Sequence, residues 1–284
     1  MNFDPRLQAI RSDLADIRLG DLAGAVPRVE GQVRQVSAPL LSLHREPRFD
    51  SRQQTQALLG ESLRVFDSRE GWAWVQLERD GYVGYASEDD LTAGITAPTH
   101  RVAVNSTFLF PDADIKSQPP EIVTLNAAVT VTGTQGAYAQ LSNHRFVYAA
   151  HLAPVESYES DPVSVAERFL HVPYLWGGKS VLGIDCSGLA QLALEACGIA
   201  CPRDSDLQEA ALGKPIAHDH LRRGDLVFWK GHVGFMCDGE QLLHANGHHM
   251  LTVIEPLSEA VSRIAAKGAG AITSIKRLGW RCLR

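Results

Sequence analysis

Short runs of alternating apolar and polar residues fill the chain between residues 31 and 155. Such alternation predicts half-buried strands, and short strands about every ten residues are typical of small barrels. The runs of the first stretch are ESLRVF, WAWVQLE and GYVGYA, and those of the second stretch are AAVTVT, YAQLS and RFVYAA. Because the order of features recurs, the pattern predicts an internal repeat of two small β domains, 31–95 and 96–155. Residues 1–30 lack this alternation and predict an irregular or partly helical arm.

The period of the pattern changes after an acidic, proline-containing linker at 153–162. Helical spacing follows at 162–172, where Pro162 is placed to open the helix, and again at 186–198, which ends on a glycine. A loop and a helix at 201–213 precede the strand-like runs DLVFWK, HVGFMC and EQLLHANG, then MLTVIEP with a helix, and ITSIKRL. Helices followed by an antiparallel meander predict an α+β domain over residues 156–284.

Composition narrows the function classes. The chain has 284 residues and a formal net charge of −6 without a sustained basic stripe, which disfavours binding to nucleic acid. No apolar stretch approaches the length of a membrane span, and the first residues lack the pattern of a signal peptide. The five cysteines are odd in number and irregularly spaced, as expected of reduced thiols. These features predict a cytoplasmic protein with no membrane partner.

Cys186 stands at the start of the helix predicted at 186–198, with Asp185 or a neighbour as its cap. A helix N-terminus favours a thiolate through its unpaired N–H groups and its dipole, and the same groups can hold an oxyanion. This placement indicates a nucleophilic cysteine, although a cysteine in an apolar helix also serves as a small buried side chain.

A thiolate needs a base, and the base needs an orienting group. His232 and His244 lie in two strand-like runs joined by a short turn. A three-residue loop over 237–239 with a left-handed Gly239 would pair Met236 with Glu240 and set the two histidines directly opposite each other. We therefore expect one imidazole to orient the other, and two unrelated half-buried histidines are the alternative.

The motifs DCSGL, RGDLVFWKGHVGFM and LLHANG, in this order, resemble those of the NlpC-type cell-wall cysteine peptidases. This resemblance implies a papain-like α+β catalytic domain, and the two preceding β domains are similar to bacterial SH3-like barrels. The whole arrangement is most similar to γ-D-glutamyl-L-diamino acid endopeptidases of the dipeptidyl-peptidase VI type.

Family roles carry over onto the matching positions. The resemblance implies Cys186 as nucleophile, His232 as general base and His244 as the orienting residue, with Tyr174 in PYLWGG supporting the oxyanion. It further implies a set of substrate-binding residues, which are Glu61, Tyr82, Asp185, Ser187 and Ser205. Within that set, Glu61, Tyr82 and Asp185 are implied to bind a free N-terminal amine, and Ser205 the carboxylate of D-glutamate.

The implied reaction is hydrolysis of the bond between γ-D-glutamate and a diamino acid, lysine or diaminopimelate, in a murein-derived peptide with free N-terminal L-alanine. No cofactor is implied. Two histidine clusters, HDH at 218–220 and HANGHH at 244–249, offer metal-ligand types but lack HExxH or paired CxxC spacing, so we expect no metal. A non-catalytic wall-peptide-binding protein and a papain-like amidase or acyltransferase are the alternatives.

Overall fold

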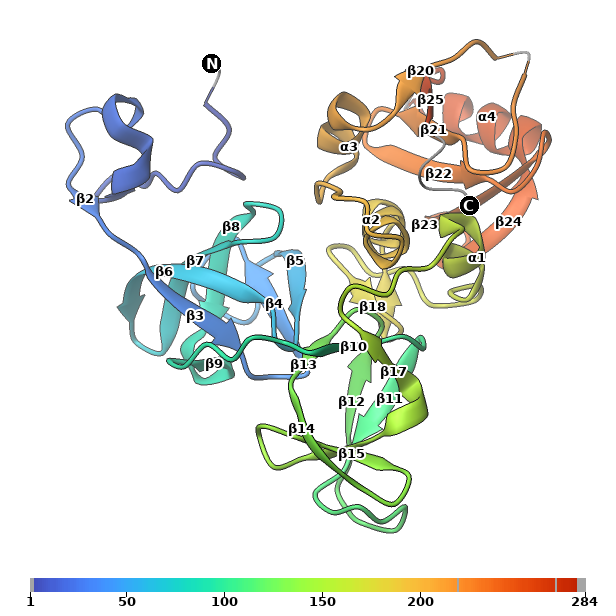
Figure 1. Ribbon diagram of the computed structural model, residues 1–284. Coiled ribbons are helices and arrows are strands. Elements are labelled where there is room, and N and C mark those ends of the chain that lie inside the picture. The colour runs from blue at the N-terminus through green and yellow to red at the C-terminus, as the bar shows by residue number, and fades with distance from the viewer. Residues whose placement is uncertain (1–2, 219, 269, 280–284) are drawn as a thin grey trace. The chain divides into compact units, whose positions relative to one another are not determined.

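The structure is a computed structural model that describes residues 3–218, 220–268 and 270–279. The chain divides into two compact units, Met1–Val155 and Glu156–Arg284 (Figure 1). No helix in the described ranges is long and apolar enough to cross a membrane. Each unit is described below by itself.

The first unit begins with a short arm and a seven-stranded antiparallel sheet. Its strands are β3 (Gln32–Val36), β4 (Leu40–His44), β5 (Gln53–Leu58), β6 (Ser62–Arg69), β7 (Trp72–Leu77), β8 (Val83–Ser87) and β9 (Leu91–Thr92). They lie in the order β5-β4-β8-β7-β6-β3-β9. Alternate residues, such as Leu41, Leu43 and Val75, are fully buried in one apolar core. Glu70 and Gly71 both have positive φ, which suits the tight two-residue turn between β6 and β7.

The arm contains β1 (Ala15–Asp16), a 3₁₀ helix η1 (Ile17–Ala23) and β2 (Arg28–Val29). β1 and β2 pair in parallel, and Ala9 packs with the rings of Phe66 and Trp74. This small apolar cluster holds the arm against β6 and β7.

The rest of the first unit is a second β region. Its strands are β10 (His100–Val102), β11 (Ser106–Leu109), β12 (Glu121–Thr124), β13 (Ala128–Val129), β14 (Val131–Gln135), β15 (Tyr138–Leu141), β16 (Phe146–Tyr148) and β17 (Leu152–Pro154). They form two three-stranded sheets and one two-stranded sheet. Both β regions end with a strand, a one-turn 3₁₀ helix and a short strand, through η2 (Glu88–Asp90) and η3 (Ala149–His151). This shared ending matches the recurrence seen in the sequence.

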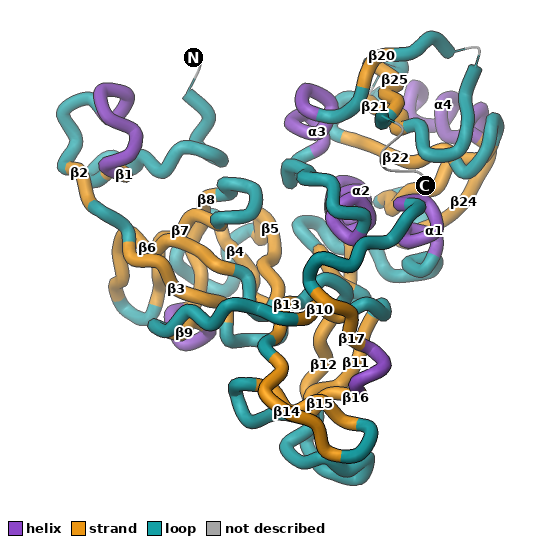
Figure 2. The backbone as a smooth tube through the Cα atoms, viewed as in Figure 1, coloured by secondary structure: helices purple, strands orange, loops and turns teal. Residues whose placement is uncertain are grey.

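The second unit places three of its four described helices before most of its strands, as the α+β pattern predicts (Figure 2). The helices are α1 (Pro162–Glu167), α2 (Cys186–Ala196), α3 (Ser205–Ala211) and α4 (Leu257–Ala266). The strands are β18 (Lys179–Ser180), β19 (Gly183–Ile184), β20 (Lys214–Pro215), β21 (Leu226–Trp229), β22 (His232–Met236), β23 (Gln241–Asn246), β24 (Leu251–Pro256) and β25 (Ser274–Arg277). Six of them form one antiparallel sheet in the order β20-β25-β21-β22-β23-β24.

Helix α2 is buried along nearly its whole length, and it contacts β22 and β23 of the sheet. Leu189, Leu192 and Ala193 are at most 1% exposed. Fully burying a leucine side chain stabilises a fold by about 1.5–3 kcal/mol. The helix is thus a fixed support for the residue at its N-terminus.

The register of the β22–β23 hairpin differs from the sequence-based prediction. Met236 pairs with Leu242 and not with Glu240, and the backbone N–H of Cys237 bonds to the carbonyl of Gln241. The loop therefore covers residues 238–240, and Gly239 does not have a positive φ. Asp238 is the physical reason, because its side chain accepts the backbone N–H groups of Glu240 and Gln241 and closes the turn one residue later.

Candidate active site

Cys186 is the first residue of α2, and Asp185 is its N-cap. The Asp185 carboxylate accepts the backbone N–H of Gly188 at 2.7 Å, as expected of a cap. The thiol is buried, with 8% of the residue exposed. A cysteine therefore stands where the free N–H groups of a buried helix converge.

Burial, and then the charge of Asp185, raises the pKa of the Cys186 thiol to about 12. The backbone N–H groups of Val233 and Ser187 and the charge of Arg203 act in the opposite direction but do not outweigh burial. The N–H group at the helix N-terminus favours the thiolate, as expected, but desolvation is the larger effect and the net pKa is raised. The contact with Val233 also places the sulfur at the start of β22, because Val233 directly follows His232 in the sequence.

His232 and His244 meet through their ring nitrogens. The Nε2 atom of His232 lies 2.7 Å from Nδ1 of His244, and the ring centroids are 5.0 Å apart. A two-residue turn, Lys230-Gly231, places His232 as the first residue of β22. The corrected register changes the pairing by an even number of residues, so both side chains stay on one face of the sheet, in diagonal positions.

Gly234 gives His244 the room that this arrangement needs. A Cβ atom at position 234 would lie 3.1 Å from the Cβ of His244 and 2.9 Å from Cδ1 of Leu242. The strand thus carries a glycine opposite the second ring because a side chain there would press against it.

The sequence analysis missed Glu255 and Arg263. Nε2 of His244 lies 2.6 Å from Oε1 of Glu255, and both residues are buried. Arg263 on α4 donates to both carboxylate oxygens, with Nη1 2.6 Å from Oε2. Burial alone would raise the pKa of Glu255, but the hydrogen bonds from His244 and Arg263 outweigh it and hold that pKa at about 2. Glu255 is therefore an anion that accepts from the second ring.

The two imidazoles are kept neutral. Burial, followed by the neighbouring ring and the Arg263 cation, lowers the pKa of His232 to about 3. Burial also lowers the pKa of His244, against the opposing effect of Glu255. Neutral rings at pH 7 can each donate one proton and accept another, as proton transfer requires.

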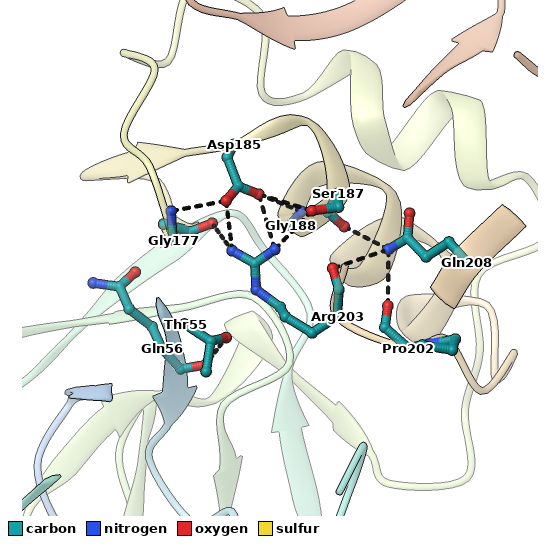
Figure 3. Close-up of polar contacts among 10 residues, drawn as sticks. Thr55, Gln56, Gly177, Asp185, Ser187, Gly188, Pro202, Arg203 and Gln208 are labelled. Atoms are coloured by element: carbon teal, nitrogen blue, oxygen red, sulfur yellow. Dashed lines mark hydrogen bonds and ion pairs between the residues drawn. The ribbon is translucent and has the colours of Figure 1, made fainter. Parts of the chain in front are cut away.

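A second polar network surrounds the N-terminus of α2 (Figure 3). Arg203 is 1% exposed, and its guanidinium donates to both oxygens of Asp185, at 3.0 and 2.7 Å. Its Nη1 atom also donates to Ser187 Oγ at 2.8 Å, and Asp185 further accepts the backbone N–H of Gly177. Arg203 therefore orders the two predicted substrate-binding residues on either side of Cys186, a role that the sequence analysis did not assign.

The other predicted residues lie in several places. Tyr174 is in the loop before α2, bridged to Ile184, and burial followed by the charges of Cys186 and Asp185 raises its pKa. Ser205 is the first residue of α3 and is buried. Glu61 and Tyr82 belong to the first unit, where Glu61 pairs with Arg79 at 3.3 Å and Tyr82 is part of the β core. The structure thus brings together Cys186, Tyr174, Asp185 and Ser187 around one helix end.

Of the two histidine clusters considered for metal binding, HDH at 218–220 includes residue 219, which lies outside the described residues. The histidines at the end of HANGHH have other partners. His248 and His249 contact each other edge to face, and Asn246 accepts the backbone N–H groups of both. Among the described residues, no group of three or more His, Cys, Asp or Glu side chains is arranged to hold a metal ion.

Comparisons with known proteins agree with this geometry. Residues 43–91 match the bacterial dipeptidyl-peptidase SH3 domain, and residues 171–267 match the NlpC/P60 family. The chain is 26% identical to a gamma-D-glutamyl-L-lysine dipeptidyl-peptidase of Bacillus cereus, covering 72% of this chain and 71% of that one. It is 28% identical to the protein of the same name from Bacillus subtilis, covering 72% and 78%.

A crystal structure of an NlpC/P60 family protein from Bacillus cereus has the same fold. It superposes with a TM-score of 0.73 at 20% identity, covering 87% of this chain and 99% of that one. The β region that starts the chain is thus of SH3 type, and the α+β unit is papain-like. The chain therefore carries an NlpC/P60 cysteine peptidase domain, matched at residues 171–267, and before it an SH3 domain of the bacterial dipeptidyl-peptidase type, matched at residues 43–91.

Proposed function

We propose that the chain hydrolyses the bond between γ-D-glutamate and a diamino acid in murein-derived peptides that begin with a free L-alanine. The chain of contacts from His232 through His244 to Glu255, beside a cysteine at a helix N-terminus, carries this proposal. The names of the two Bacillus relatives, gamma-D-glutamyl-L-lysine dipeptidyl-peptidases, support the choice of bond.

The reaction starts with proton transfer from the Cys186 thiol to His232. Because burial raises the pKa of the thiol, the sulfur does not ionise by itself at pH 7 and depends on a base. The thiolate attacks the γ-carbonyl carbon of D-glutamate, and the carbonyl π electrons move to oxygen. The backbone N–H groups at the start of α2 and the Tyr174 hydroxyl stabilise that oxyanion.

Collapse of the tetrahedral intermediate breaks the C–N bond and leaves a thioester on Cys186. His232, now an imidazolium, gives its proton to the departing amine of the diamino acid. The neutral ring then removes a proton from water, which attacks the thioester and releases L-Ala-D-Glu and the thiol. His244 holds the His232 ring throughout.

Substrate recognition follows from charge. We propose that Ser187 and Ser205 bind the free carboxylate of D-glutamate, and that Glu61, Tyr82 and Asp185 recognise the N-terminal ammonium. The Asp185 carboxylate already accepts from Arg203 and two backbone N–H groups, so an ammonium would have to share it. Glu61 is likewise paired with Arg79, so an ammonium would share both carboxylates with cations that are already present.

We also propose the extent of each domain. Residues 1–30 form the arm, 31–95 and 96–155 two SH3-like domains, and 156–284 the peptidase domain. The shared ending of the two β regions supports the second SH3-like domain.

The test is product analysis after incubation with L-Ala-γ-D-Glu-L-Lys and with its N-acetylated form. We expect L-Ala-D-Glu and lysine from the first peptide and little cleavage of the second. Cys186→Ala should abolish turnover, whereas Cys237→Ala, another thiol of the same unit, should leave it intact. Cleavage by Cys186→Ala would refute the nucleophile, and equal cleavage of both peptides would refute amine recognition while sparing the peptidase activity.

A further inference from the structure

Four side chains from four elements form a continuous polar chain behind the candidate nucleophile. His232 is on β22, His244 on β23, Glu255 on β24 and Arg263 on α4. The successive contacts are 2.7 Å between the rings, 2.6 Å from His244 to Glu255, and 2.6 Å from Arg263 Nη1 to Glu255. All the links join atoms that can share a proton or a charge.

The ionised carboxylate of Glu255 determines which ring nitrogen of each histidine carries a proton. Glu255 is ionised and only accepts, so Nε2 of His244 must carry a proton and donate it. Nδ1 of the neutral His244 ring is then an acceptor, which requires Nε2–H on His232. The remaining nitrogen of His232, Nδ1, is left with a lone pair and is the atom able to take a proton from Cys186.

Asn246 acts against this assignment, so the carboxylate of Glu255 decides it. Its Oδ1 atom accepts the backbone N–H groups of His248 and His249 at 3.1 and 2.9 Å, which points the amide nitrogen toward His244. That nitrogen lies 3.1 Å from Nε2 of His244 and only donates, so it cannot receive the His244 proton. Of the two groups that face Nε2 of His244, Glu255 and the Asn246 amide nitrogen, only Glu255 can accept its proton.

We propose that Glu255, anchored by Arg263, is a positioning residue that fixes the tautomers of both histidines and stabilises the His232 imidazolium formed during catalysis. The inference rests on the proposed function, because it assumes that His232 is the base. Without Glu255, the Asn246 amide can donate to Nε2 of His244. The proton of His244 then moves to Nδ1, donates to Nε2 of His232 and leaves His232 protonated on Nδ1, where it cannot accept from the thiol.

The charged and titratable groups that face the two rings all enter this balance. Glu255 favours the charged form of both rings, Arg263 opposes it, and His249 opposes it at His244. Cys186 at the start of α2 contacts the backbone of Val233, the residue after His232. Removal of Glu255 therefore has two separable effects. The proton of His244 is no longer held on Nε2, and the Arg263 cation loses the carboxylate that balances its charge.

Two substitutions separate these effects. In Glu255→Gln the side-chain oxygen can still accept from Nε2–H, so the tautomers persist and only the charge is lost. In Glu255→Met the negative charge and the acceptor for Nε2–H are both lost. The double variant Glu255→Met with Arg263→Met removes the unpaired cation as well, so it remains testable if the single methionine variant does not fold.

The first readout is the nitrogen chemical-shift pattern of the histidine rings at pH 7, with His232→Gln and His244→Gln used for assignment. We expect Nε2–H on both rings in the wild type and in Glu255→Gln, and Nδ1–H on both rings in Glu255→Met and in the double variant. Unchanged tautomers in a folded methionine variant would overturn the inference.

The second readout is the pair of kinetic constants kcat and kcat/KM on L-Ala-γ-D-Glu-L-Lys. We expect a loss of about 10- to 100-fold for Glu255→Gln, as for other carboxylates that support a functional histidine. We expect a loss of about 10³- to 10⁴-fold in kcat for the methionine variants, the effect of a wrong tautomer in other hydrolases. Wild-type activity in a methionine variant refutes the positioning role. A wild-type chain that fails to cleave the peptide, yet has the expected tautomers, refutes the proposed function and leaves the proton arrangement standing.

Discussion

Replacing His232 with glutamine tests whether the Cys186 thiol depends on that ring for its reactivity. Burial and the Asp185 charge, not the ring, raise the pKa of the thiol to about 12, so this value should persist in the variant. At pH 7 a thiol of that pKa is ionised to about one part in 10⁵, against about 3% for an ordinary cysteine of pKa about 8.5. Its thiolate is intrinsically about 40-fold more nucleophilic, because nucleophilicity rises with pKa.

These two factors combine to an alkylation rate about 100-fold below that of an ordinary cysteine. In the wild type, we expect His232 to accept the thiol proton as the sulfur attacks, which offsets this penalty, so iodoacetamide should modify Cys186 about as fast as an ordinary thiol. Mass spectrometry of the digested protein measures the rate at each cysteine separately. Cys237 is the internal control, because burial also raises its pKa, to about 11, and the charges that act on it belong to Glu167, Arg223, Asp238 and Asp161 and not to His232.

The expected result is that His232→Gln slows labelling of Cys186 at pH 7 by about 100-fold or more and leaves the labelling rate of Cys237 unchanged. The labelling rate of Cys186 in the variant should recover as the pH rises above 9. Equal labelling of Cys186 in the variant and the wild type would show that the thiol ionises without a base. The general-base step of the proposed mechanism would then be refuted.

Three further predictions concern stability and packing. Arg203→Met leaves the buried Asp185 carboxylate without its cation, so the free energy of unfolding in urea should fall by about 3–5 kcal/mol. The pKa of His232 is lowered from 6.5 to about 3, so below pH 6.5 the unfolded chain binds a proton that the folded protein does not. The free energy of unfolding should therefore fall as the pH falls, by up to about 1.4 kcal/mol per pH unit. His232→Gln should flatten this slope in urea titrations at pH 7, 5 and 4. Gly234→Ala should lower kcat by displacing His244, while Gly94→Ala, where a Cβ meets open space and φ is not positive, should leave it unchanged. Equal rates for the two would contradict the close packing.

The elements that the sequence predicted well are those whose signals are local. Pro162 opens α1, Asp185 caps α2 and Gly198 follows its end with a positive φ, each because one side chain or one dihedral decides the outcome. The hairpin register was wrong because the choice between two loops depended on the Asp238 side chain closing the turn. The contact of His232 with His244 survived that error, since an even change of register keeps both residues on one face.

The pKa of Cys186 could not be inferred from its place in the sequence. Its helix N-terminus favours the thiolate, but whether water reaches the sulfur depends on how β22 packs against α2. Burial is set by tertiary structure, and here it outweighs the N–H groups. The same limit applied to Arg203, which reaches Asp185 from 18 residues further along the chain, beyond helix α2 and the irregular loop that follows it.

Glu255 differs from these cases, because a local signal for it existed. It is an acidic residue in the otherwise apolar run TVIEP, and a four-residue loop after Asn246 pairs Leu242 with Glu255 and His244 with Val253. Glu255 is then the diagonal neighbour of His244 on the same face, within reach of its ring. A carboxylate in that position is costly to bury unless it has a partner. The strand could therefore have been predicted to carry the acceptor for His244, and with it the direction of proton transfer at His232.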